Sequence, residues 1–242
     1  MPELAVRETE IKGLYEIGLD IRGDERGSFR EVFQAAKLEA LGLPSLGPVQ
    51  WNIAENNRRG TLRGIHAEPW DKYVHMISGE AFAAIVDVRA ESPTFGRVCT
   101  FTLGPGNALF LSRGLGNSYQ VTSDGGVYGY LVNQHWSPDA TYTLVSFRDP
   151  DLAIDWPLEP TDVSDKDLGH PPLRELFPGA FSSLEGQNQT AGSLSQREEQ
   201  PTRRTDPTLH RGGQGTRVNG GGQRLRASIR INVPVTEDLS NR

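Results

Sequence analysis

The sequence predicts an all-β fold, a jelly roll or barrel, with one small connecting helix and a disordered C-terminal tail. Three observations support this prediction. Short apolar segments alternate with turn residues as far as residue 178. These segments are rich in Val, Ile, Phe and Tyr, which are typical of strands. Helical spacing of apolar residues occurs in a single segment.

The predicted helix comes first, at residues 31–42, where apolar residues recur at helical spacing and Gly42 closes the segment. A strand is expected to end near His66. The other predicted strands cover residues 49–55, 73–79, 81–89, 98–104, 108–114, 127–133 and 142–147.

The chain is predicted to divide into a folded domain, residues 1–177, and a tail, residues 178–242. The tail is polar and rich in Gly, Arg and Gln, and it shows no apolar period, so we expect it to be disordered. Its arginines are diluted by Gly, Gln and Thr, with no aromatic residue between them. That pattern does not favour nucleic-acid binding.

Composition narrows the possible classes of protein. The 242 residues are 36% hydrophobic and 23% charged, with a net charge of −6, which is typical of a globular protein. No apolar run approaches the ~20 residues that span a bilayer. The first residues lack the apolar core of a signal peptide. A single cysteine excludes an intrachain disulfide. We therefore expect a cytoplasmic protein with no membrane partner.

Four residues are candidates for proton-transfer chemistry: His66, Lys72, Tyr130 and Asp167. Imidazole titrates near neutral pH and can remove a proton, and a carboxylate bonded to it fixes its tautomer. An ammonium group stabilises an enolate, and a phenol can return a proton to a carbanion. Each residue also has an ordinary interpretation, as a structural histidine, a solvated lysine, a core tyrosine or a surface acid.

Other residues suggest recognition of an anion or a base. Arg26 and Arg63 both lie beside glycine, and guanidinium suits bidentate phosphate binding. The alternative interpretation is that both arginines are ordinary surface cations. Trp136 is either a rim aromatic or a stacking platform for a nucleobase.

A metal site is weakly indicated. His66 and Glu68 form one His-x-Glu pair, and His75 and His135 lie further along the chain. This spacing is not a strong ligand pattern, so we expect no metal site and no cofactor.

Several segments in a fixed order resemble the dTDP-4-dehydrorhamnose 3,5-epimerase family, from about residue 8 to residue 176. The segments that carry the resemblance are DERGSFRE, QWN, TLRGIH, ESPTFG, DPDLAIDWPL and SDKD. The resemblance implies a cupin-like jelly roll, a homodimer, and a dTDP-linked 4-keto-6-deoxyhexose as substrate. It implies epimerisation at C3, C5 or both through an enolate, without cofactor or metal.

The resemblance also implies roles for single residues. His66 corresponds to the base, Asp167 to its carboxylate partner, Tyr130 to the proton donor and Lys72 to the lysine beside the enolate. Trp136 takes the place of an aromatic residue that stacks on thymine. The remaining nucleotide and phosphate contacts correspond to Arg26, Glu31, Gln50, Asn52, Arg63 and Lys166.

Two positions depart from the family pattern. Asn117 stands where the family has a second active-site histidine, and Thr141 stands where a glutamate is expected. Asparagine can hydrogen-bond a sugar or phosphate but cannot carry a proton. These departures leave two alternatives beside an active epimerase: a sugar-nucleotide binder without catalysis, and a metal-dependent cupin enzyme.

Overall fold

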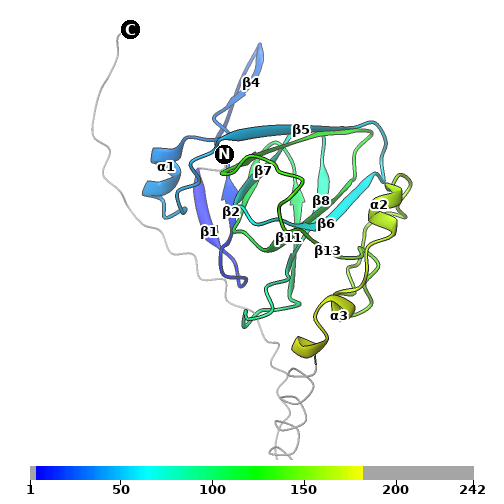
Figure 1. Ribbon diagram of the computed structural model, residues 1–242. Helices are drawn as coiled ribbons and strands as arrows, with labels where there is room; N and C mark the ends of the chain where they lie inside the picture. Colours follow the sequence, from blue (N-terminus) through cyan, green and yellow to red (C-terminus); the bar gives the residue numbers. More distant parts are fainter. Residues whose placement is uncertain (1–3, 182–242) are drawn as a thin grey trace, which may run out of the picture. The chain divides into compact units, whose positions relative to one another are not determined.

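The computed structural model describes residues 4–181, which form two antiparallel β-sheets and a separate hairpin (Figure 1). The larger sheet has the order β1-β2-β10-β7-β12-β5, and the smaller sheet has the order β13-β6-β11-β8-β9. Most neighbours in these sheets are not consecutive in the chain, as expected of a jelly roll. The predicted fold class is confirmed.

The strands of the larger sheet are β1 (Ala5–Glu8), β2 (Leu14–Gly18), β5 (Gln50–Asn56), β7 (Lys72–Ser78), β10 (Asn107–Leu111) and β12 (Gly126–Val132). The strands of the smaller sheet are β6 (Leu62–Ala67), β8 (Ala81–Asp87), β9 (Val98–Leu103), β11 (Leu115–Val121) and β13 (Thr143–Leu144). The hairpin consists of β3 (Ile21–Asp24) and β4 (Gly27–Arg30).

Three short helices accompany the sheets: α1 (Ala35–Ala40), α2 (Asp165–Leu168) and α3 (Leu173–Leu176). Among residues 4–181, none of the helices has the length and apolar character needed to cross a membrane.

The main hydrophobic core combines residues of both sheets. Val74 and Met76 of β7 are buried in one cluster with Ala83 and Ile85 of β8. A second cluster joins the smaller sheet to the chain after residue 145, and a third joins α1 to the larger sheet. Burial of alternate residues on facing sheets is the main force that holds such a sandwich together.

The strand expected to end near His66 is present as β6, and the seven other predicted strands are also present, although the last is reduced to the two residues of β13. The predicted helix is also confirmed in a shorter form, as α1.

The four short strands β1 to β4 and the one-turn helices α2 and α3 were not predicted, because each has only four or five residues and shows no clear period. The strand β11 was not predicted either, because its sequence LGNSYQV contains Gly, Asn and Ser, which disfavour strands in isolation. Each of its residues is buried, and pairing with β6 and β8 on both sides outweighs this weak propensity.

The SPTFG segment, residues 92–96, stabilises the loop between β8 and β9 through hydrogen bonds to Asp87. Asp87, at the end of β8, is fully buried and accepts hydrogen bonds from Ser92, Thr94 and Arg89. Burial raises the pKa of Asp87, but these donors outweigh burial and hold the pKa below its usual value. The ionised carboxylate therefore anchors the loop between β8 and β9.

The described chain continues past the predicted domain boundary at residues 177/178. Phe181 is buried and packs against Phe95 with ring centroids 5.6 Å apart. The boundary itself stays a prediction. Residues 182–242, which make up nearly all of the predicted tail, lie outside the described residues.

Candidate functional site

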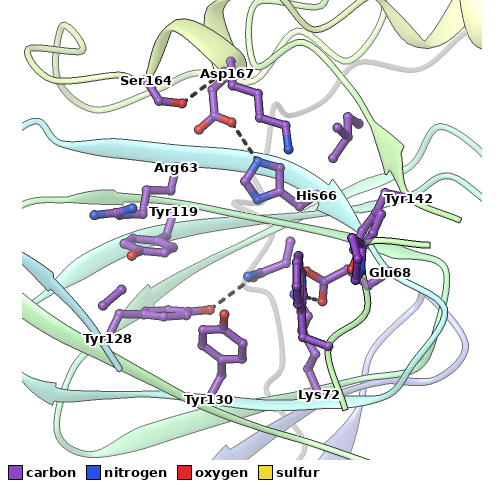
Figure 2. A pocket seen from close by; sticks show the side chains of 16 residues that line it. Arg63, His66, Glu68, Lys72, Tyr119, Tyr128, Tyr130, Tyr142, Ser164 and Asp167 are labelled. Atoms are coloured by element: carbon purple, nitrogen blue, oxygen red, sulfur yellow. Dashed lines mark hydrogen bonds and ion pairs between the residues drawn. The ribbon is translucent and has the colours of Figure 1, made fainter. Parts of the chain in front are cut away.

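A cavity of about 550 Å³ opens between the two sheets, and residues from both of them line it (Figure 2). This volume is in the usual range for a small-molecule site. The lining residues are Ala54, Arg63, His66, Glu68, Lys72, Asn117, Tyr119, Tyr128, Tyr130, Trp136, Pro138, Tyr142, Leu144, Ser164, Lys166 and Asp167.

β6 carries two of these residues, Arg63 and His66, although their odd spacing would place them on opposite faces of a regular strand. The pairing with β11 explains this: Asn117 lies opposite His66, whereas Tyr119 lies opposite Arg63. Two steps on β11 match three on β6, so β6 contains a bulge. Gly64 lies in the bulge with φ of 122°, which glycine adopts readily. The bulge allows both side chains to line the cavity.

His66 and Asp167 form a hydrogen-bonded pair, with Nε2 2.8 Å from Oδ1. Ser164 caps α2 by accepting a hydrogen bond from the Asp167 N–H, and the Gly64 N–H donates to Asp167 Oδ2 at 3.3 Å. Burial raises the pKa of Asp167, but the contacts with His66 and Gly64 outweigh it and lower the pKa overall. An ionised carboxylate only accepts, so Nε2 carries the proton and Nδ1 keeps its lone pair.

Lys72 begins β7 and is buried beside an acid. Its Nζ lies 2.5 Å from Glu68 Oε2 and 5.2 Å from the ring centre of Tyr130. Burial lowers the pKa of Lys72, and the negative charge of Glu68 opposes that change. The carboxylate of Glu68 therefore stabilises the buried ammonium group of Lys72, which would be costly to bury without a partner of opposite charge.

Tyr130 of β12 lies across the cavity from His66 (Figure 2). Burial raises the pKa of Tyr130, and the nearby carboxylate of Glu68 raises it further. The phenol therefore keeps its proton at neutral pH and can act as an acid.

Two further tyrosines and Asn117 complete the cavity wall. Tyr128 stacks on Tyr119 with ring centroids 4.0 Å apart and planes 11° apart. Its hydroxyl donates a hydrogen bond to Asn117 Oδ1 at 3.1 Å. Burial raises the pKa of Tyr119 to about 12 and raises that of Tyr128 as well. Because the Asn117 oxygen is engaged, its amide N–H group is what Asn117 offers to a ligand.

Aromatic side chains lie at the rim. Trp136 is 60% exposed, and its backbone N–H donates to Gln50 Oε1 at 2.9 Å. Tyr142 is held by a hydrogen bond from its hydroxyl to the carbonyl of Ser137. Lys166, one residue before Asp167 in α2, supplies a positive charge to the same cavity.

Eight of the twelve residues predicted from the sequence line this cavity. They are His66, Lys72, Tyr130, Asp167, Arg63, Asn117, Trp136 and Lys166. The fold therefore brings these eight residues, which are widely separated in the chain, to one cavity.

The other four predicted residues do not line it. Arg26 is exposed on the β3–β4 hairpin, where it pairs with Asp24. Glu31 forms an ion pair with the lysine of α1. Gln50 and Asn52 lie on β5, where the Gln50 side-chain amide donates a hydrogen bond to Asn52 Oδ1. Gln50 also accepts a hydrogen bond from the backbone N–H of Trp136, which lines the cavity.

Sequence reasoning did not assign Glu68, Tyr119, Tyr128, Tyr142 or Ser164 to the site. Strand alternation was a usable signal for two of them, because Tyr119 and Tyr128 lie two residues from Asn117 and Tyr130 respectively. The sequence indicates Glu68 only as a possible metal ligand, whereas the structure shows that it forms an ion pair with Lys72.

One group of donor residues within 4–181 has spacing suited to a metal ion: His66, Asp167 and His170. The sequence pattern pointed to other metal ligands besides His66, namely Glu68, His75 and His135, and none of these three belongs to this group.

Comparison with known proteins identifies relatives over most of the described chain. Residues 8–175 match the family model of dTDP-4-dehydrorhamnose 3,5-epimerase. A protein of Streptococcus pyogenes serotype M6 named RmlC homolog is 41% identical over 184 residues, which cover 72% of this chain and 92% of the relative.

Solved structures of proteins of the same kind also resemble this chain in fold. RmlC from Streptococcus suis, in complex with dTDP-D-xylose, superposes with a TM-score of 0.68 at 40% identity, covering 72% of this chain and 93% of that chain. NovW of Streptomyces spheroides, a 4-keto-6-deoxy sugar epimerase, superposes with a TM-score of 0.67 at 33% identity, with coverage of 72% and 89%.

Proposed function

Because the chain belongs to the dTDP-4-dehydrorhamnose 3,5-epimerase family, we propose that it epimerises a dTDP-linked 4-keto-6-deoxyhexose. The inverted centre is a carbon next to the keto group: C3, C5 or both. The observation that carries this proposal is the arrangement of His66, backed by Asp167, across one cavity from Tyr130.

His66 is the proposed base. Asp167 accepts the Nε2 proton, so the Nδ1 lone pair is free to remove the proton next to the ketone. The resulting imidazolium is stabilised by the same carboxylate. Binding the sugar beside this nitrogen supplies much of the rate, because a positioned base has a high effective concentration.

The enolate needs positive charge or hydrogen-bond donors near its oxygen. Lys72 supplies an ammonium from the cavity wall, and the Asn117 amide supplies a neutral donor. Tyr130 then gives its proton to the opposite face of the carbanion, and exchange with solvent restores Tyr130 and His66. Asparagine at position 117 does not interrupt this route, because the route moves no proton through that residue.

The nucleotide is proposed to lie along the rim. Arg63 and Lys166 are the cavity cations available to the diphosphate, and Trp136 offers an exposed ring for stacking on the base. These assignments follow the family resemblance and the position of the three residues around one opening.

A homodimer is proposed from the exposed apolar surface. Trp51 and Ile53 on the outer face of β5 and Phe29 on the β3–β4 hairpin are each more than half exposed. β5 is also an edge of its sheet. Arg26 and Glu31, which do not reach the cavity of their own chain, would contact substrate from a partner subunit by means of this hairpin.

The substrate in this proposal is a small sugar nucleotide, and neither nucleic acid nor a membrane has a part in it. The cytoplasmic location expected from the sequence is kept as part of the proposal.

The proposal is tested by NMR in D₂O with dTDP-4-keto-6-deoxyglucose. The full chain should introduce deuterium next to the keto group and form an epimer, whereas His66→Ala should do neither. His135→Ala is the matched control, because it removes a histidine that does not line the cavity. Ligand-induced stabilisation without deuterium uptake would instead identify a binder, and unchanged exchange in His66→Ala would refute the assigned base.

A further inference from the structure

His170 is a buried histidine that the proposed reaction does not use. Its side chain is only 5% exposed, and neither ring nitrogen makes a hydrogen bond of regular geometry, although a contact with the backbone of Val145 partly offsets the lowering of the ring pKa by burial. Buried polar groups in folded proteins are nearly always paired, because an unpaired group loses its hydration without compensation. The position of His170 therefore calls for a physical explanation.

The orphaned imidazole lies beside the His66–Asp167 pair. His170 Nε2 is 3.8 Å from Asp167 Oδ1, which in turn is 2.8 Å from His66 Nε2. The two imidazole rings meet edge to face, with centroids 5.6 Å apart. The donor atoms of the three residues all lie within 4.8 Å of one another. Two imidazoles and one carboxylate oxygen thus converge on one point.

We propose that His66, Asp167 and His170 form an inhibitory site for a divalent transition metal of the zinc type. Tetrahedral zinc with bonds near 2.0 Å holds its ligand atoms about 3.3 Å apart. The separations of Asp167 Oδ1 from the two histidine nitrogens, 2.8 Å and 3.8 Å, lie on either side of this value. The third separation, between the two histidines, is at most 4.8 Å, so side-chain rotations of the two rings would bring the three ligand atoms to tetrahedral spacing.

The surroundings suit such an ion. The Gly64 N–H holds Asp167 Oδ2, which leaves Oδ1 as the oxygen that faces both histidines. Burial lowers the pKa of His170, although Asp167 opposes this, so the ring stays neutral and keeps a lone pair for a metal. His66 and Asp167 both line the open cavity, which provides a path for entry of an ion.

A metal at this site would block the proposed reaction, and this consequence rests on the proposed function of His66. A neutral imidazole has one proton and one lone pair on its two nitrogens. When a metal takes the Nε2 lone pair, the ring proton must lie on Nδ1. Nδ1 then has no lone pair with which to accept the sugar proton, and Asp167 is also occupied.

Metal binding is tested first, with Co²⁺ as a spectroscopic substitute for Zn²⁺. The full chain should develop the intense visible absorption of tetrahedral Co²⁺ with one ion per chain, and Zn²⁺ should displace it. His170→Gln should weaken Co²⁺ binding by at least about tenfold. His135→Gln, which removes a histidine outside the group, should not. Absence of the absorption in the unaltered chain would overturn the proposal, as would equal binding by both variants.

Inhibition is tested separately with the deuterium-exchange assay. Zn²⁺ should slow exchange by the unaltered chain, and a chelator should restore it. Each variant is compared with itself with and without Zn²⁺, and His170→Gln should require at least about tenfold more Zn²⁺ for half-inhibition. Cobalt binding without any exchange activity would refute the epimerase proposal but keep the site. Exchange that Zn²⁺ leaves unchanged would refute the inhibitory site alone.

Discussion

The two nitrogens of His66 have different tasks in the proposed reaction. Asp167 accepts the proton of Nε2, and this contact selects the tautomer whose Nδ1 is unprotonated. The carboxylate remains ionised because the donors around it, His66 and Gly64, outweigh the effect of burial on its pKa. The hydrogen bonds around Asp167 therefore set the tautomer of the base before a substrate binds.

Tyr130→Phe removes the proposed proton donor and leaves His66 and Asp167 in place. Epimer formation should fall by about 10²–10⁴-fold, the usual contribution of a positioned acid. Deuterium exchange at one carbon should be affected less, because abstraction and return at the His66 face need no phenol. NMR that follows exchange and inversion together checks this. Equal losses of exchange and inversion at both carbons would contradict the assignment.

Glu68→Gln tests the charge balance of Lys72. Burial lowers the pKa of Lys72 and Glu68 raises it, so removing the negative charge should lower this pKa further. The ammonium is then lost at a lower pH, and the Tyr130 phenol, whose pKa Glu68 also raises, ionises at a lower pH as well, so the alkaline decline of kcat/KM should begin at a lower pH than in the unaltered chain.

The matched control for this variant is Glu55→Gln, because Glu55 is exposed on β5 and does not line the cavity. Its pH profile should match that of the unaltered chain. Identical profiles for all three proteins would show that Glu68 does not set the charge of Lys72.

At the scale of single elements, the bulge in β6 decides the geometry of the site. It brings Arg63 and His66 to one cavity, and the Gly64 N–H within it binds Asp167. A Cβ added at Gly64 would lie 2.5 Å from Ser118 Cβ and 2.7 Å from the carbonyl oxygen of Asn117. The close approach of β6 and β11 thus requires glycine at this position.

Gly64→Ala should lower the free energy of unfolding by about 4 kcal/mol, because strain at positive φ adds to overpacking. Gly96→Ala is the matched control. Gly96 also has positive φ, but a Cβ there meets nothing within 4 Å, so it should cost only about 1 kcal/mol. Urea unfolding of both variants measures the difference. Similar losses would mean that packing against β11 is not what demands glycine.

At the scale of the whole molecule, the outer face of β5 is a surface that favours association. Trp51 is 58% exposed and Ile53 is 51% exposed on an edge strand. Phe29 is 71% exposed and lines the same surface groove as Trp51, and grouped apolar side chains of this kind are typical of association surfaces. This surface supports the proposed homodimer, in which a hairpin from one subunit completes the cavity of the other.

Trp51→Glu should convert the proposed homodimer to monomers at micromolar concentration, because it places a charge within an apolar interface. Sedimentation velocity measures the change, and KM for the nucleotide sugar should rise in the same variant. Leu176→Glu serves as a control, because it places the same charge on another exposed apolar residue, in α3 and away from β5. A chain that sediments as a monomer before any substitution would refute the homodimer.

The sequence by itself determined the strand pattern and the motif residues of the site. Alternation of apolar residues is local, so the predicted strands could be read without knowledge of their neighbours. Motifs around His66, Lys72, Tyr130 and Asp167 indicated proton transfer, and the fold brings all four to one cavity. The family resemblance supplied their roles, which stay proposals for this chain.

Only the tertiary structure decided which distant residues meet. His66 and Asp167 are 101 residues apart, and their contact depends on how α2 packs beside the bulge of β6. The pairing of Lys72 with Glu68 and the nearness of His170 to Asp167 likewise follow from the fold. Local patterns specify which face of a strand a residue occupies, whereas strand register and loop path place two faces opposite each other.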